Sequence, residues 1–132
     1  MKLNIRVIRS QDFLKVTPTG EIDLEASKRA LLKLASEDSA SRQHEILVDI
    51  RQTIGHLTLT EITELVEVMI DHRDSFRSKL AILARPGLGF DHAKFMELYA
   101  NNRGFYVGAF MDFEETINWL MDSSELTVEG RI

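Results

Sequence analysis

"LVDIRQTIGHLTLTEI", residues 47–62, joins a short apolar run to the start of a helix and decides how the rest of the chain is interpreted. The apolar run Ile46–Val48 suits a strand that is covered on both faces. Asp49 follows this run, and the loop after it carries Thr53, His56 and Thr58. A buried strand that leads through a polar loop into a helix is typical of an α/β domain.

The helix after this loop is the clearest element in the sequence. Thr58 and Glu61 have the spacing of a capping box, and Leu57 with Ile62 has that of a hydrophobic staple. Thr58 is therefore predicted to be the N-cap of this helix. The apolar residues behind it keep the i, i+3, i+4, i+7, i+8 spacing of one buried stripe: Ile62, Leu65, Val66, Met69 and Ile70.

Working outward, the alternation of apolar and polar residues predicts the remaining elements. Upstream are strands at 2–9 and 13–17, a turn at Ser10–Asp12, the strand end at Pro18–Gly20 and a helix to about residue 37. Downstream are a strand at 79–85, a turn at 86–90, a helix at 91–103, a strand at 105–111 and a helix at 113–121.

The order ββαβαβαβα predicts a single α/β domain over residues 1–121. Its sheet should be mostly parallel and mixed, with about five strands, an N-terminal antiparallel hairpin and about four helices. Residues 122–132 are interpreted as a C-terminal tail. The sequence leaves the order of the strands within the sheet open.

Composition excludes several classes of function. The chain of 132 residues has 16 Lys and Arg against 21 Asp and Glu, a net charge of -5, and no basic stripe, so nucleic acid and anionic membranes are not expected as main partners. No cysteine is present, which excludes a disulfide framework, a thiolate zinc site and a Cys nucleophile. No segment approaches the ~20 apolar residues of a membrane-spanning helix, and a cytoplasmic protein is expected.

No enzyme, metal site or cofactor is predicted. The sequence holds no GxSxG elbow, and none of its four histidines stands in an HxH or HExxH arrangement. The stretch "RPGLGFDH", residues 85–92, sets a glycine-rich turn between a strand and a helix, but lacks the third glycine of GxGxxG and the Lys-Ser/Thr of a P-loop.

Five residues in two loops are candidates for an interaction or anion-binding surface. Exposed helix amides favour negative charge, so a small anion could rest near Arg85 and Gly89. Asp49 lies at a strand's carboxyl end, where open α/β sheets place their ligands, although it could equally tie down loop amides. The full candidate set is Asp49, His56, Arg85, Gly87 and Gly89.

Three fragments in the right order resemble one known family. "VTPTGEIDLEASKRALLKLAS", residues 16–36, is similar to the second strand and first helix of STAS domains, the anti-sigma-factor antagonist and sulfate-transporter group. "EILVDIR", residues 45–51, resembles their central strand with its terminal Asp. "VGAFMDFEETINWL", residues 107–120, resembles the closing strand and helix of the SpoIIAA-like branch. The resemblance covers about residues 3–121.

The resemblance implies a non-enzymatic cytoplasmic fold that binds protein partners and, in some branches, nucleotides or apolar ligands. Well-understood members are switched by phosphorylation of a Ser in an Asp-Ser-Ser-Gly-type motif at the start of the helix after the central strand. The matching stretch here, residues 56–60, reads His-Leu-Thr-Leu-Thr and lacks the acidic residue, both serines and the glycine. Thr58 lies nearest to the acceptor position and is the candidate phosphoacceptor.

An excess of apolar side chains near the C-terminus points to something beyond the sheet. On the helix at 91–103 they span more than half the circumference, and on the last helix Trp119 projects off the apolar stripe. Filling the layer between adjacent helices is the plainest interpretation. The functional interpretations are a homodimer interface, or a pocket for a small apolar, lipid-like ligand that the chain carries or senses. The residues concerned are Phe95, Met96, Tyr99 and Trp119.

Overall fold

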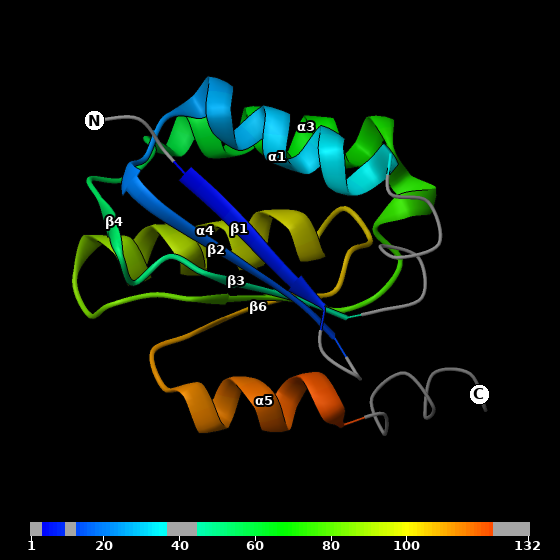
Figure 1. Cartoon of the computed structure of the whole chain (residues 1–132). Coiled ribbons are helices and arrows are strands. Elements are labelled where there is room, and N and C mark those ends of the chain that lie inside the picture. The colour runs from blue at the N-terminus through cyan, green and yellow to red at the C-terminus, as the bar shows by residue number, and fades with distance from the viewer. Residues whose placement is uncertain (1–3, 10–12, 37–44, 123–132) are drawn as a thin grey trace.

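The computed structural model of the chain describes residues 4–9, 13–36 and 45–122. The strands are β1 (Asn4–Arg9), β2 (Phe13–Glu21), β3 (Glu45–Asp49), β4 (Thr53–Ile54), β5 (Leu80–Leu83) and β6 (Val107–Phe110). The helices are α1 (Leu24–Ser36), α3 (Leu59–Asp71), α4 (Leu88–Asn101) and α5 (Phe113–Met121), with a short 3-10 helix, η1 (Arg73–Ser75). Figure 1 shows the sheet between helical layers.

The strands form one mixed sheet in the order β1-β2-β3-β5-β6. β2, β3, β5 and β6 run parallel, and β1 lies antiparallel to β2. The predicted α/β fold with a mostly parallel sheet and four helices is confirmed. The predicted turn at Ser10–Asp12 and the predicted tail from residue 123 onward lie outside the described residues.

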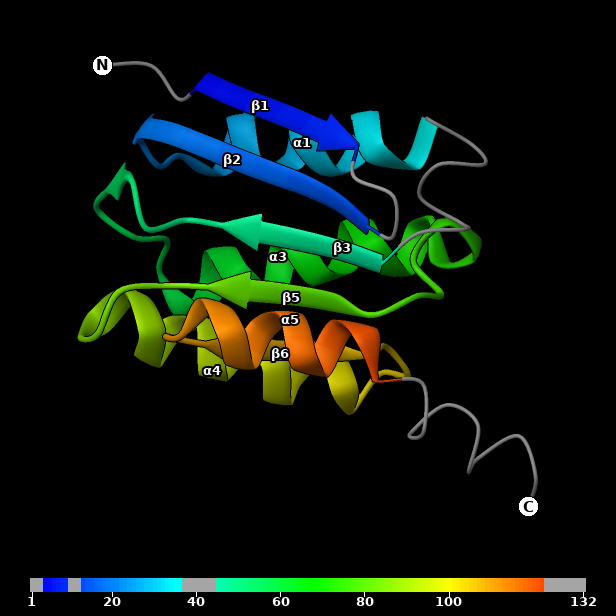
Figure 2. The same ribbon diagram turned by 60° about the horizontal axis from the view of Figure 1, so that its bottom comes forward.

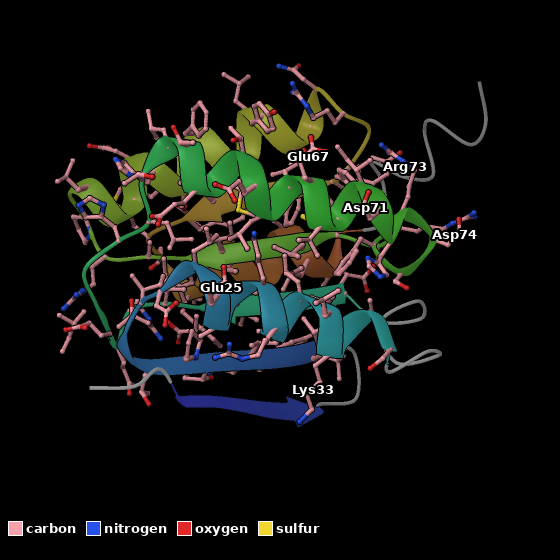
Figure 3. All side chains as sticks on the ribbon, turned by 90° about the horizontal axis from the view of Figure 1, so that it is seen from above. Glu25, Lys33, Glu67, Asp71, Arg73 and Asp74 are labelled. Carbon is pink, nitrogen blue, oxygen red and sulfur yellow. The ribbon has the colours of Figure 1, made fainter. Side chains whose placement is uncertain are left out.

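Helices cover the two faces of the sheet unequally. α1, α3 and α4 lie on one face and α5 on the other, as Figures 1 and 2 show. Viewed from above in Figure 3, α1 and α3 lie side by side, and their exposed residues include Glu25, Lys33, Glu67 and Asp71. The face with three helices holds the larger of the two apolar clusters.

Successive residues of β3 point to opposite faces of the sheet. Leu47 is fully buried against Leu120 and the other residues on the α5 side. Its neighbour Val48 packs with the cluster under α1, α3 and α4.

The second strand is longer than its sequence predicts. β2 does not end at Pro18–Gly20 but continues to Glu21. Gly20 and Glu21 pair with Thr53 and Ile54 of β4, a two-residue strand that no periodicity reveals. The pairing of β4 with the last two residues of β2 holds the loop after β3 against the end of that strand.

The turn predicted at residues 86–90 is shorter than expected. Helix α4 begins at Leu88, so Gly89 and Phe90 belong to its first turn. Gly87 precedes the helix with φ 109°, a conformation that glycine adopts without a Cβ clash, and the chain therefore enters the helix directly after Gly87.

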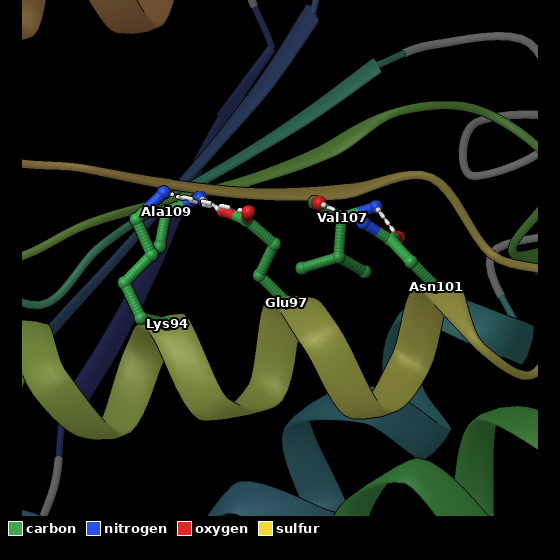
Figure 4. A network of polar contacts seen from close by, with 5 residues as sticks. All are labelled: Lys94, Glu97, Asn101, Val107 and Ala109. Atoms are coloured by element: carbon green, nitrogen blue, oxygen red, sulfur yellow. Dashed lines mark hydrogen bonds and ion pairs between the residues drawn. The ribbon is translucent and has the colours of Figure 1, made fainter.

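Polar side chains of α4 close the outer edge of the sheet, as Figure 4 shows. The Asn101 amide accepts a hydrogen bond from the Val107 N–H (2.8 Å) and donates one to the Val107 carbonyl (3.0 Å). The Ala109 N–H donates to Glu97 Oε1 (2.7 Å), and Lys94 pairs with the same carboxylate. The outward main-chain groups of β6 therefore bond to a helix of the same chain where another strand would otherwise be able to pair.

Candidate functional site

A cavity of about 640 Å³ lies between the sheet and the helices α1, α3 and α4. Protein interiors are close-packed, so a space of this size is far outside ordinary packing defects and within the range of small-molecule sites. Val48 lies on the central strand and still is only half-buried, because the cavity reaches from solvent down to the sheet. Most of the lining is aliphatic: Val16, Ile22, Leu31, Leu34, Val48, Ile50, Leu57, Ile62, Leu65, Leu80, Ile82 and Met96.

Small side chains keep this space open. Ala30 of α1, Ala84 after β5 and Ala93 of α4 all line the cavity. A longer side chain at any of these positions would extend into the space that the helices enclose. The same helices are nonetheless anchored, since Leu31, Leu65 and other residues of their inner faces are buried.

The cavity opens at the carboxyl ends of the parallel strands, and its polar residues gather there. Arg85 Nη2 donates a hydrogen bond to the Thr53 carbonyl (2.9 Å), which ties the loop after β5 to β4. His92 Nδ1 donates to the Leu57 carbonyl (2.7 Å), and the His56 ring lies edge-on to His92 with centroids 4.6 Å apart. Contacts between side chains and main chain thus hold the two loops at the mouth together.

Three of the predicted loop residues meet at this mouth. Arg85, His56 and Gly89 all line the cavity. Gly87 is the N-cap residue of α4 beside them, but it is not among the lining residues. Asp49 lies apart from this group, because it follows Val48 and therefore points to the α5 side of the sheet.

Asp49 is a buried carboxylate that forms an ion pair with Arg51, whose side chain is 40% exposed. Its carboxylate is 3% exposed and accepts hydrogen bonds from Arg51 Nε (2.9 Å), Arg51 Nη2 (2.9 Å) and the Arg51 main-chain N–H (3.1 Å). Burial by itself raises the pKa of this carboxyl, but the hydrogen bonds and charge of Arg51, together with the charge of Lys15, outweigh it and lower the pKa below its ordinary value. The loop-anchoring interpretation of Asp49 accounts for all of these contacts.

The ion pair predicts a pH-dependent stability. A carboxyl whose pKa is lowered on folding stabilises the protein above its unfolded-state pKa of about 3.9, and loses this contribution as pH falls through the lower folded value. We expect Asp49→Asn to reduce the free energy of unfolding at pH 7 by about 1.5–3 kcal/mol, as for a hydrogen-bonded charged group. Urea unfolding at pH 7 and pH 3 measures the difference, which should shrink at the lower pH. Asp71→Asn, at an exposed carboxylate, is the control; an Asp49→Asn deficit that is equal at both pH values contradicts the prediction.

Thr58 is the N-cap of α3, as predicted. Its hydroxyl oxygen accepts a hydrogen bond from the Glu61 N–H (3.1 Å), and its own N–H donates to Glu61 Oε1 (2.9 Å), which completes the capping box. The staple residues Leu57 and Ile62 are both buried. Thr58 is exposed at the start of the helix, and its role as a phosphoacceptor stays a prediction.

The structure does not bring Phe95, Met96, Tyr99 and Trp119 together in one pocket, and their use as a homodimer interface stays a prediction. Only Met96 lines the cavity. Phe95 and Tyr99 stack on each other along α4 with centroids 5.8 Å apart. Trp119 lies on the opposite side of the sheet and packs on Phe110 at 5.4 Å, because α5 covers that face.

Sequence reasoning missed most of the residues that form the cavity. Val48, Ala30 and Ala93 have the same hydrophobic spacing that a closed core would have, so no signal distinguishes them. His92 is not among the candidate site residues of the sequence analysis. Its position beside Arg85 in "RPGLGFDH" was the one available sign, because that turn was already a candidate anion site.

Two kinds of site find no support in the part of the chain that the structure describes. No three His, Asp or Glu side chains there are grouped as metal ligands would be. None of the described helices has the length and apolar character needed to span a membrane.

Comparison with known proteins identifies the fold. No family model and no curated protein matches the sequence. An uncharacterised DUF3478 protein with a SpoIIAA-like fold from Shewanella loihica PV-4 superposes with a TM-score of 0.60 at 20% identity, covering 89% of this chain and 93% of that one. An anti-sigma factor antagonist from Mycobacterium paratuberculosis gives a TM-score of 0.60 at 13% identity, covering 92% and 96%. These two structures confirm the predicted SpoIIAA-like fold.

Proposed function

We propose that this STAS-like chain is a non-enzymatic regulatory module of the bacterial cytoplasm that binds a protein partner at the carboxyl ends of its strands. The supporting observation is a group of exposed apolar residues on the segments around the cavity mouth, here called the apolar rim: Ile54, Leu59 and Leu88, which are 52%, 45% and 58% exposed. Covering such side chains is favourable, and aliphatic groups gathered on adjoining segments are typical of protein interaction sites. An anti-sigma factor antagonist with the same fold agrees with a regulatory role.

Thr58 is the proposed phosphoacceptor of this module. It is exposed and directly precedes Leu59 of the apolar rim. A phosphate at Thr58 would be favoured by the N-terminus of α3 and would add about two negative charges beside the rim. Phosphorylation would therefore change affinity for a partner that covers Leu59.

Site-specific photocrosslinking in growing bacteria tests the interaction surface. A photoreactive phenylalanine analogue at Leu59 or Leu88 should give one discrete adduct with another protein. Leu32 and Leu98, exposed apolar residues outside the rim, are the matched control positions and should not give that adduct. The same adduct from all four positions, or none from the rim, contradicts the proposal. Adducts of the chain with itself would identify a homodimer.

The cavity favours a second function, the binding of a small apolar ligand that the chain carries or senses. The observation is the open, largely aliphatic space of about 640 Å³. Native mass spectrometry of protein purified without refolding should detect a retained molecule, and the same spectrum reports the oligomeric state. Val48→Phe places a larger side chain into the cavity from the sheet and should abolish retention. Protein that is always ligand-free, and takes up no apolar compound when one is added, contradicts this second function.

A further inference from the structure

We propose that the cavity selects a single-chain amphiphile with an anionic head group, and that Arg85 at the mouth binds the head. This inference rests on the second proposed function, the binding of an apolar ligand, and adds the chemical class of that ligand. It follows from the charge of the lining, from its hydrogen-bond donors and from the direction in which the cavity extends.

The charge of the lining is opposite to that of the chain. Asp and Glu outnumber Lys and Arg by 21 to 16 over the whole sequence. Among the described residues that line the cavity, however, there is no Asp or Glu, whereas one arginine and two histidines are present. An anionic group at the mouth would therefore meet a cation without a competing carboxylate from the lining.

The lining hydroxyls already use their hydrogen atoms. The Thr53 hydroxyl donates to the Ile50 carbonyl (2.8 Å), and the Ser27 hydroxyl donates to the Asp23 carbonyl (2.8 Å). They are left as acceptors, so they can accept from the O–H or N–H of a ligand but have no hydrogen to donate to an anion. They do not compete with Arg85 for an anion.

Arg85 has N–H groups that can donate to a ligand in addition to the one that binds Thr53. The Arg85 side chain is exposed at the mouth, and the hydrogen bond that the structure shows for it goes to the Thr53 carbonyl. A guanidinium carries five N–H donors in a planar fork, which matches the geometry of carboxylate and phosphate. The Thr53 bond fixes the side chain at the mouth, where the guanidinium can pair with an anionic head while the aliphatic lining beneath it covers the tail.

The cavity extends along the strands. Its lining includes Leu80 at the start of β5 and Ala84 just after that strand's end. Four residues of extended chain span roughly 13 Å. A volume of about 640 Å³ would hold on the order of 20 non-hydrogen atoms if each takes the ~30 Å³ of a water molecule. An elongated aliphatic space with one cationic end fits one hydrocarbon chain with one anionic head.

Calorimetric titration tests the selectivity with ligands that share a tail. Dodecanoate, dodecyl phosphate and dodecanol are titrated at pH 7, low salt and concentrations below micelle formation. We expect at least one anionic ligand to bind at least tenfold more tightly than dodecanol, and the better of the two identifies the head group as carboxylate or phosphate. Arg85→Gln should remove this preference and leave dodecanol binding unchanged, whereas Arg85→Lys should retain part of it because a cation remains.

Arg77→Gln is the matched control, since Arg77 is an exposed arginine outside the cavity lining. Thermal unfolding establishes that each variant is folded. Binding of all three ligands with equal affinity would overturn the head-group inference and leave the apolar site intact. An anionic preference that survives in Arg85→Gln would overturn the role of Arg85. No binding of any ligand would instead contradict the second proposed function itself.

Discussion

Lys79→Met is expected to lower the free energy of unfolding by about 2–3 kcal/mol, although it replaces a buried charge with an apolar side chain of similar length. Lys79 is 1% exposed and immediately precedes β5. Its Nζ donates hydrogen bonds to the Trp119 carbonyl (2.7 Å) and to the Asp122 carbonyl, and lies 5.0 Å from the centre of the Trp119 ring. The sheet thereby supplies a cation to the C-terminal end of α5, whose own last turn has no basic residue.

The expected loss comes from the carbonyls that remain. Removing a buried ion pair can be neutral when both partners are replaced together. In Lys79→Met, however, the two carbonyls stay in place and lose the ammonium donor, while the Trp119 carbonyl keeps the longer hydrogen bond from the Asp122 N–H (3.3 Å). A hydrogen bond to a charged group contributes about 1.5–3 kcal/mol, which is the loss expected here. The favourable contact between the ammonium group and the Trp119 ring is lost as well.

Urea unfolding followed by circular dichroism measures the loss, and the fluorescence of Trp119, the only tryptophan in the chain, reports locally on the end of α5. Lys33→Met, at an exposed lysine in the last turn of α1, is the matched control and should change stability by no more than about 0.5 kcal/mol. Equal stability of Lys79→Met and the wild type would mean that water satisfies the carbonyls, and that Lys79 does not anchor α5.

Periodicity and capping chemistry were enough to predict much of this fold. The stripe from Ile62 to Ile70 and the Thr58–Glu61 box determine α3 locally, and the structure confirms both. The short strand β4 could not be predicted, because two residues carry no period and its pairing depends on Gly20 and Glu21, which are distant in sequence.

The sides on which the helices lie depend on strand order, which the sequence left open. Once β2, β3, β5 and β6 are known to be adjacent in that order, right-handed crossovers place α1, α3 and α4 on one face. α5 follows the last strand and makes no crossover, so it is free to cover the other face. This separation is why Met96 and Trp119, which were grouped by their apolar character, lie on opposite sides of the sheet.

The cavity was beyond sequence reasoning for a different reason. Its lining has the apolar pattern of a core, and whether such positions touch or leave a space depends on the separation of the helices. The mouth was more predictable, because Arg85 and Gly89 lie where a strand leads into a helix N-terminus. Sequence reasoning thus located the polar end of the candidate site and missed the space beneath it.

Combined Glu97→Ala and Asn101→Ala substitution should open the β6 edge of the sheet and cause self-association. The Val107 N–H and carbonyl and the Ala109 N–H now bond to these two side chains. Without them, three main-chain groups would turn to water or to another strand, and an unpaired strand edge is a template for pairing between chains. We expect a loss of about 2–3 kcal/mol in the free energy of unfolding, since each lost hydrogen bond contributes about 1 kcal/mol.

Sedimentation velocity over a range of protein concentrations, together with urea unfolding, distinguishes the two effects. Asn102→Ala, at an exposed residue just past the end of α4, is the matched control. It should leave both the free energy of unfolding and the oligomeric state unchanged. If the double variant keeps wild-type stability and does not self-associate, water hydrogen-bonds the main-chain groups of β6 as well as α4 does, and the prediction is contradicted. Association without loss of stability would show that Glu97 and Asn101 prevent pairing between chains but contribute little to folding. That result is expected if their hydrogen bonds to β6 only replace hydrogen bonds to water.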